Sequence, residues 1–214
     1  MTEPTGRSAA PAAPRRGGPR GRPPSTSRGE IADAAMRLFV EHGFDETTVD
    51  EIGRAVGINR RTLFRYYDSK NDIVWGEFSE QLERLHDELR AGPDDEPVLE
   101  AVRRSVIAFN DWGPDSLPVL RVRMDLITTV PALQAHSTLR YADWCQVIAD
   151  YVAERLGVDS HAHVPQVVAQ AALGVSIATY RVWVRDGGDL LDQMDQGFRL
   201  LATGFPEAAL RAGA

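Results

Sequence analysis

Three helix-start signals between residues 27 and 72 constrain the fold of this 214-residue chain more than any other feature. In each signal, a serine or threonine that can cap a first helical turn is followed three residues later by an acid that can reach back to the cap. The three signals are Ser27-x-x-Glu30, Thr48-x-x-Glu51 and Ser69-x-x-Asp72. Gly43 and Gly57 fit positions after the first two helices where the backbone needs a positive φ. The front of the chain is therefore predicted to be entirely helical.

Apolar residues recur at helical spacing through the rest of the chain, and no strand-like alternation or hairpin turn interrupts them. Glycine and proline clusters divide this pattern into segments. We expect an all-α fold with nine helices, at about residues 27–43, 48–56, 59–67, 69–91, 97–112, 115–129, 132–156, 161–186 and 189–205.

The net charge of −7 is unevenly distributed along the chain. Residues 1–70 carry a net charge of +3 and residues 71–214 a net charge of −10. This asymmetry favours a basic end that faces nucleic acid, on an acidic body that phosphate backbones repel.

The single cysteine, Cys145, excludes an intramolecular disulfide and fits a reducing compartment. No apolar run approaches the ~18 residues of a membrane span, and the N-terminus lacks the apolar core of a signal peptide. We therefore expect a cytoplasmic protein without a membrane partner.

Residues 1–27 are rich in proline, glycine, alanine and arginine and have almost nothing to bury, so we expect a disordered arm. Within it, Pro19-Arg20-Gly21-Arg22-Pro23 resembles the core of an AT-hook. Arg20 and Arg22 could lie in a narrow A·T minor groove, where negative potential is concentrated. The alternative is a solvated tail without a DNA contact.

The second and third predicted helices are joined by a tight turn at Gly57, and Asn59 is a good N-cap for the third. On the third helix, Leu63 and Tyr67 can face the first two helices. Arg60, Arg61 and Phe64 then lie together on the opposite side. An apolar inner face with an arginine-rich outer face is typical of a helix-turn-helix that enters a DNA major groove.

The last two predicted helices carry more apolar and small-residue surface than docking alone needs. The eighth helix has small residues that allow close approach, and the ninth has a large apolar set. We expect a homodimer through these two helices, and the alternative is an intrachain core. The residues concerned are Ala171, Gly174, Val175 and Ala178 on the eighth helix, and Leu190, Leu191, Met194, Phe198, Leu201 and Phe205 on the ninth.

Residues 47–70 read TTVDEIGRAVGINRRTLFRYYDSK. This segment resembles the DNA-binding segment of the TetR family of bacterial transcription regulators. The longer run that continues to Phe78 resembles one branch of that family, the regulators of the mycofactocin system. The family resemblance implies a helix-turn-helix domain over residues 28–72, a ligand-binding and dimerisation domain over 73–206, and a tail at 207–214.

The resemblance also implies which residues contact DNA. Phosphates would be held by Thr48, Thr62, Tyr66 and Lys70, and base edges would be met by Arg60, Arg61 and Phe64, with Asn59 and Arg65 in the same surface. Arginine can donate two hydrogen bonds to guanine, and an aromatic edge can pack on a thymine methyl. The family often has a small residue at the position of Arg61 and tyrosine at that of Phe64. The target sequence therefore cannot be inherited from relatives.

In the family, the sixth to eighth helices enclose a ligand and the fourth transmits its presence to the DNA. The mycofactocin branch implies an acyl-CoA, which has an anionic head and an apolar tail. Candidate apolar wall residues are Phe109, Trp112, Leu120, Met124, Trp144, Ile148, Leu173 and Ile177. Candidate polar contacts are Asn110, Arg121, Arg123 and Arg140, because guanidinium groups match phosphates and carboxylates. The alternatives are plain core for the apolar set and surface ion pairs for the arginines.

The resemblance implies a repressor that a small molecule releases from a palindromic operator, without cofactor or metal. An enzyme is one rival, but Gly174-Val175-Ser176-Ile177-Ala178 lies inside a predicted helix and not at a nucleophile elbow. His161 and His163 fit a solvated helix start better than a metal site. The other rival is an architectural or nonspecific DNA-binding protein, which the arginine-rich arm would suit and the acidic body would not.

Overall fold

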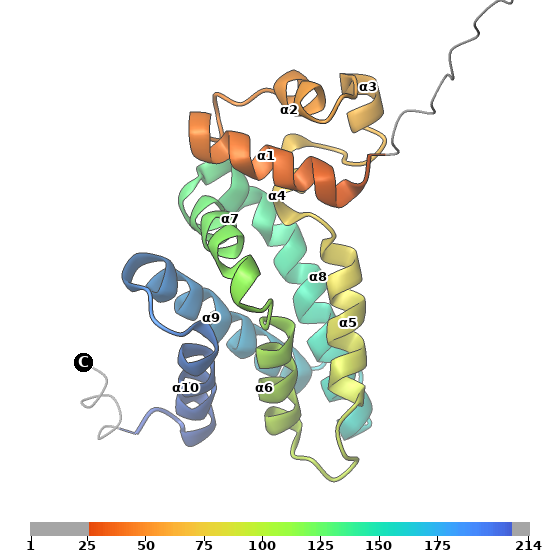
Figure 1. Cartoon of the computed structure of the whole chain (residues 1–214). Coiled ribbons are helices and arrows are strands. Elements are labelled where there is room, and N and C mark those ends of the chain that lie inside the picture. The colour runs from red at the N-terminus through yellow and green to blue at the C-terminus, as the bar shows by residue number, and fades with distance from the viewer. Residues whose placement is uncertain (1–25, 207–214) are drawn as a thin grey trace, which may run out of the picture.

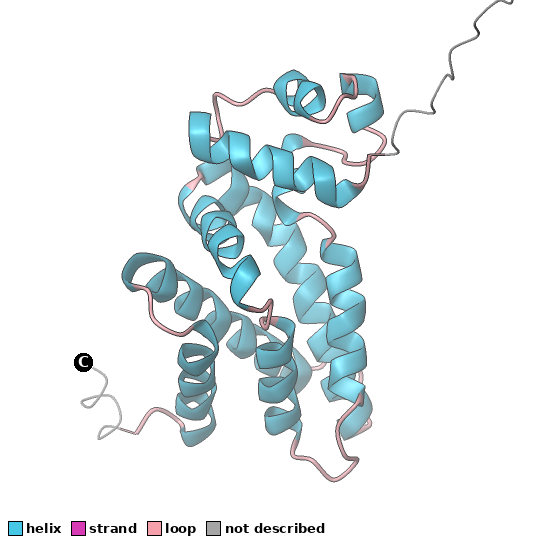
Figure 2. Ribbon diagram, viewed as in Figure 1, coloured by secondary structure: helices cyan, strands magenta, loops and turns pink. Residues whose placement is uncertain are grey.

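The computed structural model describes residues 26–206, and every regular element in that range is a helix (Figure 2). The all-α prediction is therefore confirmed. Residues 1–25 and 207–214 lie outside the described part, and so do the predictions made for the arm and the tail, including Arg20 and Arg22. Ten α-helices and one short 3-10 helix are present between residues 26 and 206, one α-helix more than the nine expected.

Helices α1 (Arg28–His42), α2 (Val49–Ala55) and α3 (Arg60–Leu63) form one end of the molecule, which we call the head (Figure 1). Capping fixes where these helices begin. Ser27 and Thr48 each accept a hydrogen bond from the third amide of their helix, and the acid there reaches back to the cap amide. The Asn59 side chain accepts from the Thr62 amide at 2.8 Å.

Helix α3 is shorter than predicted. After Leu63 the chain tightens into a turn, in which the amides of Arg65 and Tyr66 donate to the carbonyls three residues earlier at 3.1 and 2.9 Å. The turn still carries Tyr67 inward, where its hydroxyl donates to the Arg28 carbonyl at 2.9 Å. The expected division of faces holds, because Leu63 and Tyr67 are buried whereas Arg60, Arg61 and Phe64 are exposed.

The predicted long fourth helix is two helices, α4 (Lys70–Trp75) and α5 (Phe78–Arg90). Gly76, with a φ of +59°, breaks the helix between them. The break lets Trp75 and Phe78 meet edge to face, with their ring centroids 5.0 Å apart, and both rings are buried. This division accounts for the additional helix.

Helix α5 and the remaining helices form the body: α6 (Val98–Phe109), α7 (Leu117–Thr129) after a 3-10 turn (Pro114–Ser116), α8 (Pro131–Leu156), α9 (His163–Asp186) and α10 (Leu190–Thr203). Helix α8 packs against α5, α7 and α9, and α10 lies against α9 and α6. Helix α1 of the head packs against α7, and α4 connects head and body by packing against α1, α7 and α8 (Figure 1). One continuous apolar core runs from α1 to α10.

Helix α9 is the one helix between residues 26 and 206 that is long and apolar enough, by length and composition alone, to cross a bilayer. No uninterrupted apolar run of such length was expected in the chain, and Gln166 and Gln170 do interrupt the apolar residues of this helix. One such helix is weak evidence for a membrane span, and α9 packs between α8 and α10 as a body helix.

A close backbone approach holds α2 against the start of α3 and yields a first prediction. A Cβ added at Gly53 would lie 2.7 Å from the Ile58 carbonyl oxygen, a group that cannot move without shifting the turn. We expect Gly53→Ala to lower the free energy of unfolding by about 1–3 kcal/mol, as overpacking does. Gly29→Ala in α1 is the control, because its Cβ meets only Ser27 Oγ at 3.9 Å. Urea unfolding that finds the two variants equally stable would contradict this account.

Candidate DNA-binding surface and ligand cavity

The outer face of α3 presents two arginines and an aromatic ring. The Arg60 guanidinium lies 5.3 Å from the centroid of the Phe64 ring and 3.5 Å from a carboxylate oxygen of Asp50. Both members of this ion pair are largely exposed, so solvent screens it and it is weak. Arg61 is exposed beside them. These three side chains can therefore contact a partner without any change in the fold of the head.

Most of the other residues predicted to contact DNA have roles inside the head. The Thr48 hydroxyl donates to Glu51 at 2.8 Å, and Asn59 caps α3. Thr62 and Tyr66 are half-buried, and Tyr66 packs against the core. Their predicted contacts with phosphates stay predictions. Arg65 is exposed but lines a cleft at the junction with the body.

Lys70 has a structural role that the sequence did not reveal. Its ammonium donates to the carbonyls of Phe44 at 2.7 Å and Thr47 at 3.1 Å, and it lies 4.3 Å from the centroid of the Phe44 ring. A longer contact to the Asp45 carbonyl measures 3.4 Å. The side chain thus ties α4 to the loop between α1 and α2. A phosphate contact by the same ammonium stays a prediction.

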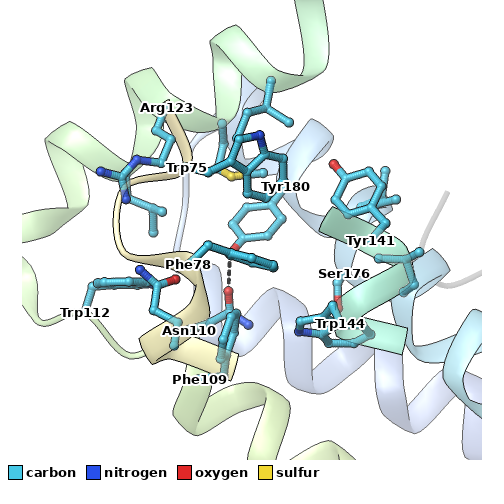
Figure 3. A pocket seen from close by; sticks show the side chains of 16 residues that line it. Trp75, Phe78, Phe109, Asn110, Trp112, Arg123, Tyr141, Trp144, Ser176 and Tyr180 are labelled. Atoms are coloured by element: carbon cyan, nitrogen blue, oxygen red, sulfur yellow. Dashed lines mark hydrogen bonds between the residues drawn. The ribbon is translucent and has the colours of Figure 1, made fainter. Parts of the chain in front are cut away.

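The body encloses an apolar cavity of about 70 Å³, shown in Figure 3. All of the predicted ligand-binding residues except Arg121, Arg140 and Ile148 line it. The predicted residues that it brings together are Phe109, Asn110, Trp112, Leu120, Arg123, Met124, Trp144, Leu173 and Ile177.

The three exceptions have other partners. The Arg121 guanidinium donates to the Val184 carbonyl at 2.7 Å and stacks over Trp183. Arg140 forms an ion pair with Asp72 at 2.6 Å, and Ile148 is fully buried in the core. These three residues do not line the apolar cavity, because spacing along a helix does not say which neighbour each face meets. Their contact with a ligand stays a prediction.

Sequence reasoning also missed several wall residues. Helical spacing could have found some, since Tyr141 precedes Trp144 by three positions and Tyr180 follows Ile177 by three. Trp75 and Phe78 were hidden by the unpredicted break between α4 and α5. The complete missed set is Trp75, Phe78, Gln81, Ile127, Tyr141, Ser176 and Tyr180.

Two polar groups of the cavity satisfy one another. The Tyr180 hydroxyl donates to the side-chain oxygen of Asn110, as the dashed line in Figure 3 shows. The Asn110 amide nitrogen donates in turn to the Val106 carbonyl at 2.7 Å. Burial raises the pKa of Tyr180 well above its usual range, so the hydroxyl keeps its proton.

Three other polar groups of the cavity are buried donors without an acceptor. The Nε of Arg123 and the indole nitrogens of Trp75 and Trp112 form no hydrogen bond within residues 26–206. In the same range, Arg123 has no carboxylate in ion-pairing distance, and burial lowers the pKa of its guanidinium. Leaving such donors unpaired is costly. The walls of the cavity therefore contain a positive charge and N–H donors that lack an acceptor.

Known proteins resemble the two halves of the chain separately and the whole chain together. Residues 31–74 match the family model "Bacterial regulatory proteins, tetR family", and residues 96–206 match the "MftR C-terminal domain". The mycofactocin biosynthesis transcriptional regulator MftR of Mycobacterium tuberculosis is 41% identical over 186 residues, which cover 86% of this chain and 94% of that protein.

Solved structures resemble the whole chain in fold. FadR of Thermus thermophilus in complex with lauroyl-CoA has a TM-score of 0.58 and 22% identity, and the match covers 84% of this chain and 95% of that one. FadR of Bacillus subtilis in complex with stearoyl-CoA has a TM-score of 0.60 and 19% identity, over 83% of this chain and 99% of that one. At these identities the likeness shows a shared fold.

Proposed function

Because this chain belongs to the TetR family of bacterial transcription regulators and carries the MftR type of C-terminal domain, we propose that it is a ligand-released repressor. It binds a palindromic operator as a homodimer and leaves the operator when an acyl-CoA occupies the apolar cavity. Members of the family are DNA-binding regulators and not enzymes, so the enzyme alternative is dropped. A soluble DNA-binding regulator works in the cytoplasm, which is where we place it.

In this proposal, residues 28–72 read the DNA and residues 73–206 bind the ligand and the second subunit. Arg60, Arg61 and Phe64 meet base edges in the major groove, because they form the exposed face of α3. Thr48, Thr62 and Tyr66 position the head on phosphates. Recognition of the operator sequence then depends on these three side chains of the α3 face.

The proposal that the apolar cavity binds a ligand rests on its three unpaired hydrogen-bond donors. An acyl chain matches the apolar walls, and the oxygen of its carbonyl group can accept from the donors of Arg123, Trp75 or Trp112. Since the open volume is about 70 Å³, a long chain can enter only if the walls move apart. Helix α4 supplies Trp75 to those walls and also packs against α1 of the head, so a ligand that moves α4 acts on the DNA-reading end. Acyl-CoA in the two FadR structures supports this ligand class.

The exposed face of α9 supports the homodimer proposal. Val164, Val167 and Val182 are 54%, 49% and 41% exposed along this helix, and the small residues Gly174 and Ala178 are exposed between them. By contrast, three apolar residues of α10 are buried within their own chain, namely Leu190, Met194 and Phe198. Much of the apolar surface that made α10 a candidate for the dimer interface therefore belongs to the core. We therefore propose that the two subunits meet mainly through α9, with α10 beside it.

Gly174→Arg is expected to convert the dimer into a monomer. An arginine there would place a long charged side chain where the small residues let two helices approach closely. Between residues 26 and 206, no atom beyond the adjacent residues and the nearby backbone of α9 lies within 4 Å of a Cβ at this position, so the fold itself should tolerate the change. Light scattering of the full chain checks the mass. Val40→Arg, at an exposed apolar position on α1, is the control, and a dimeric Gly174→Arg would rule out the α9 interface.

Selection of bound DNA from a random pool tests the DNA-reading part of the proposal. We expect a palindrome whose half-sites lie about one DNA turn apart, ~34–36 Å, because two symmetric recognition helices must reach successive major grooves. An architectural or nonspecific binder would instead enrich no sequence and show affinity independent of sequence. If no sequence is enriched, the repressor proposal is rejected in favour of an architectural or nonspecific DNA-binding protein.

A further inference from the structure

A second, polar opening lies at the junction of head and body, and we call it the arginine cleft. It has a volume of about 270 Å³ and is lined mostly by polar atoms. Arg28 of α1 and Arg65 after α3 come from the head, whereas Arg140 comes from α8 (Figure 1). Phe78 lines both the arginine cleft and the apolar cavity. Phe78 is therefore the lining residue that the two openings share.

The charges of the arginine cleft favour an anion. Arg28 and Arg65 are exposed and form no ion pair in the described part of the chain, and Arg28 stacks on Tyr67 at 5.6 Å. The Nε of Arg140 is buried and has no partner in that part either. Against these three guanidinium groups the cleft has two carboxylates, Asp68 and Asp72. Guanidinium groups bind phosphate through paired hydrogen bonds and suit this role better than single point charges.

Asp72 ties the connecting helix α4 to the body through the same arginine. Its carboxylate accepts from Arg140 at 2.6 Å and lies 2.9 Å from His136 Nε2, both on α8. Within its own helix it accepts from the Ser69 hydroxyl at 2.6 Å. Burial opposes ionisation, but the hydrogen bonds from Ser69 and Arg140 outweigh it and lower the pKa of Asp72. Arg140 thus holds a carboxylate whose place a phosphate could take.

We propose that the arginine cleft binds the phosphate-bearing head of the ligand whose acyl chain enters the apolar cavity, and that this phosphate competes with Asp72 for Arg140. The proposal rests on the proposed function, since it names a second subsite for the same ligand. Competition for Arg140 loosens the tie between α4 and α8 near Trp75 and Tyr141, which line the cavity with their rings 5.8 Å apart. Ligand binding and release of the head then become one event, limited by the difference in ligand affinity between the two states.

Calorimetric titration of the full-length protein with palmitoyl-CoA, free CoA and palmitate separates the two subsites. Arg140→Gln should weaken palmitoyl-CoA and free CoA binding by about tenfold to a hundredfold, the effect of losing a charged hydrogen bond, and leave palmitate binding unchanged. Asp72→Asn should act in the opposite direction and tighten palmitoyl-CoA binding, because it removes the competing carboxylate. Arg90→Gln breaks an ion pair with Glu154 away from the cleft and should alter none of the affinities.

The outcomes distinguish failure of the inference from failure of the proposed function. A wild-type protein that binds neither palmitoyl-CoA nor palmitate would overturn both. Binding of palmitoyl-CoA that Arg140→Gln leaves unaltered would overturn the arginine cleft alone. Loss of palmitoyl-CoA binding in Asp72→Asn as well as in Arg140→Gln would show that the cluster is merely structural. Retained palmitate binding serves as the check that each variant is folded.

Discussion

Arg60→Ala and Arg61→Ala are each expected to weaken operator binding by about 1–3 kcal/mol, the free energy that an arginine gains from a well-placed base edge. Both side chains lie on the exposed face of α3, where the only partner of Arg60 in the described residues, besides the Phe64 ring, is the screened carboxylate of Asp50. Removing either side chain leaves the core unchanged, because Leu63 and Tyr67 hold α3 from the other side. Gel-shift titrations on the selected operator give the affinities.

Arg37→Ala is the matched control for these variants, since it removes one exposed arginine from α1 without changing α3. Base recognition and phosphate binding are distinguished by two further measurements. A variant that no longer reads a base relaxes sequence preference at one position, whereas a variant that no longer holds a phosphate binds all sequences more weakly and lowers the salt slope by about one. Operator affinity that stays at the wild-type value in both variants would remove the two arginines from the DNA-binding surface.

Arg123→Met is expected to stabilise the fold and to abolish the response to ligand. Arg123 is half-buried beside the apolar cavity, and its Nε is buried without a partner, so replacing it with an apolar side chain of similar length removes a desolvation cost of about 1–3 kcal/mol. The same change removes a charged hydrogen-bond donor from the cavity wall and should weaken ligand binding by about 1.5–3 kcal/mol. Urea unfolding measures the first effect, and calorimetry with palmitoyl-CoA measures the second.

Arg121→Met, two positions earlier on α7, is the control for this pair of effects. Its guanidinium already donates to the Val184 carbonyl and stacks on Trp183, so its loss should reduce stability and leave ligand affinity unchanged. If Arg123→Met instead destabilised the protein and bound ligand normally, Arg123 would be a structural residue and the cavity would lack its main polar contact.

Much of the fold follows from local sequence signals, because the residues that start each helix also satisfy its first-turn amides. Ser27, Thr48 and Asn59 form the caps that the sequence predicts. The break at Gly76 could not be predicted in the same way. The apolar stripe of Val74, Phe78 and Leu82 keeps helical spacing across it, so periodicity gives no signal where the helix is interrupted.

Site residues could be predicted where they lie on one face of a single helix. They could not be predicted where the site depends on contacts between distant segments. The face of α3 follows from its own periodicity, and so do Leu120 and Met124 of α7 and Leu173 and Ile177 of α9, whereas Ile127 and Tyr180 on the same two helices were missed. The ion pair between Asp72 and Arg140 joins residues 68 positions apart, and no local pattern reports such a contact. For the same reason, Arg121 and Arg123 look alike in sequence, although the first lies against the end of α9 and the second beside the cavity.

Release of the operator by ligand can be measured by titrating palmitoyl-CoA into the complex of full-length protein and selected operator. We expect palmitoyl-CoA to release the operator from the wild-type protein and not from Arg123→Met at the same concentration, with fluorescence anisotropy of the labelled DNA as the measurement. Operator affinity that palmitoyl-CoA, other acyl-CoAs and free fatty acids all leave unchanged would contradict this expectation.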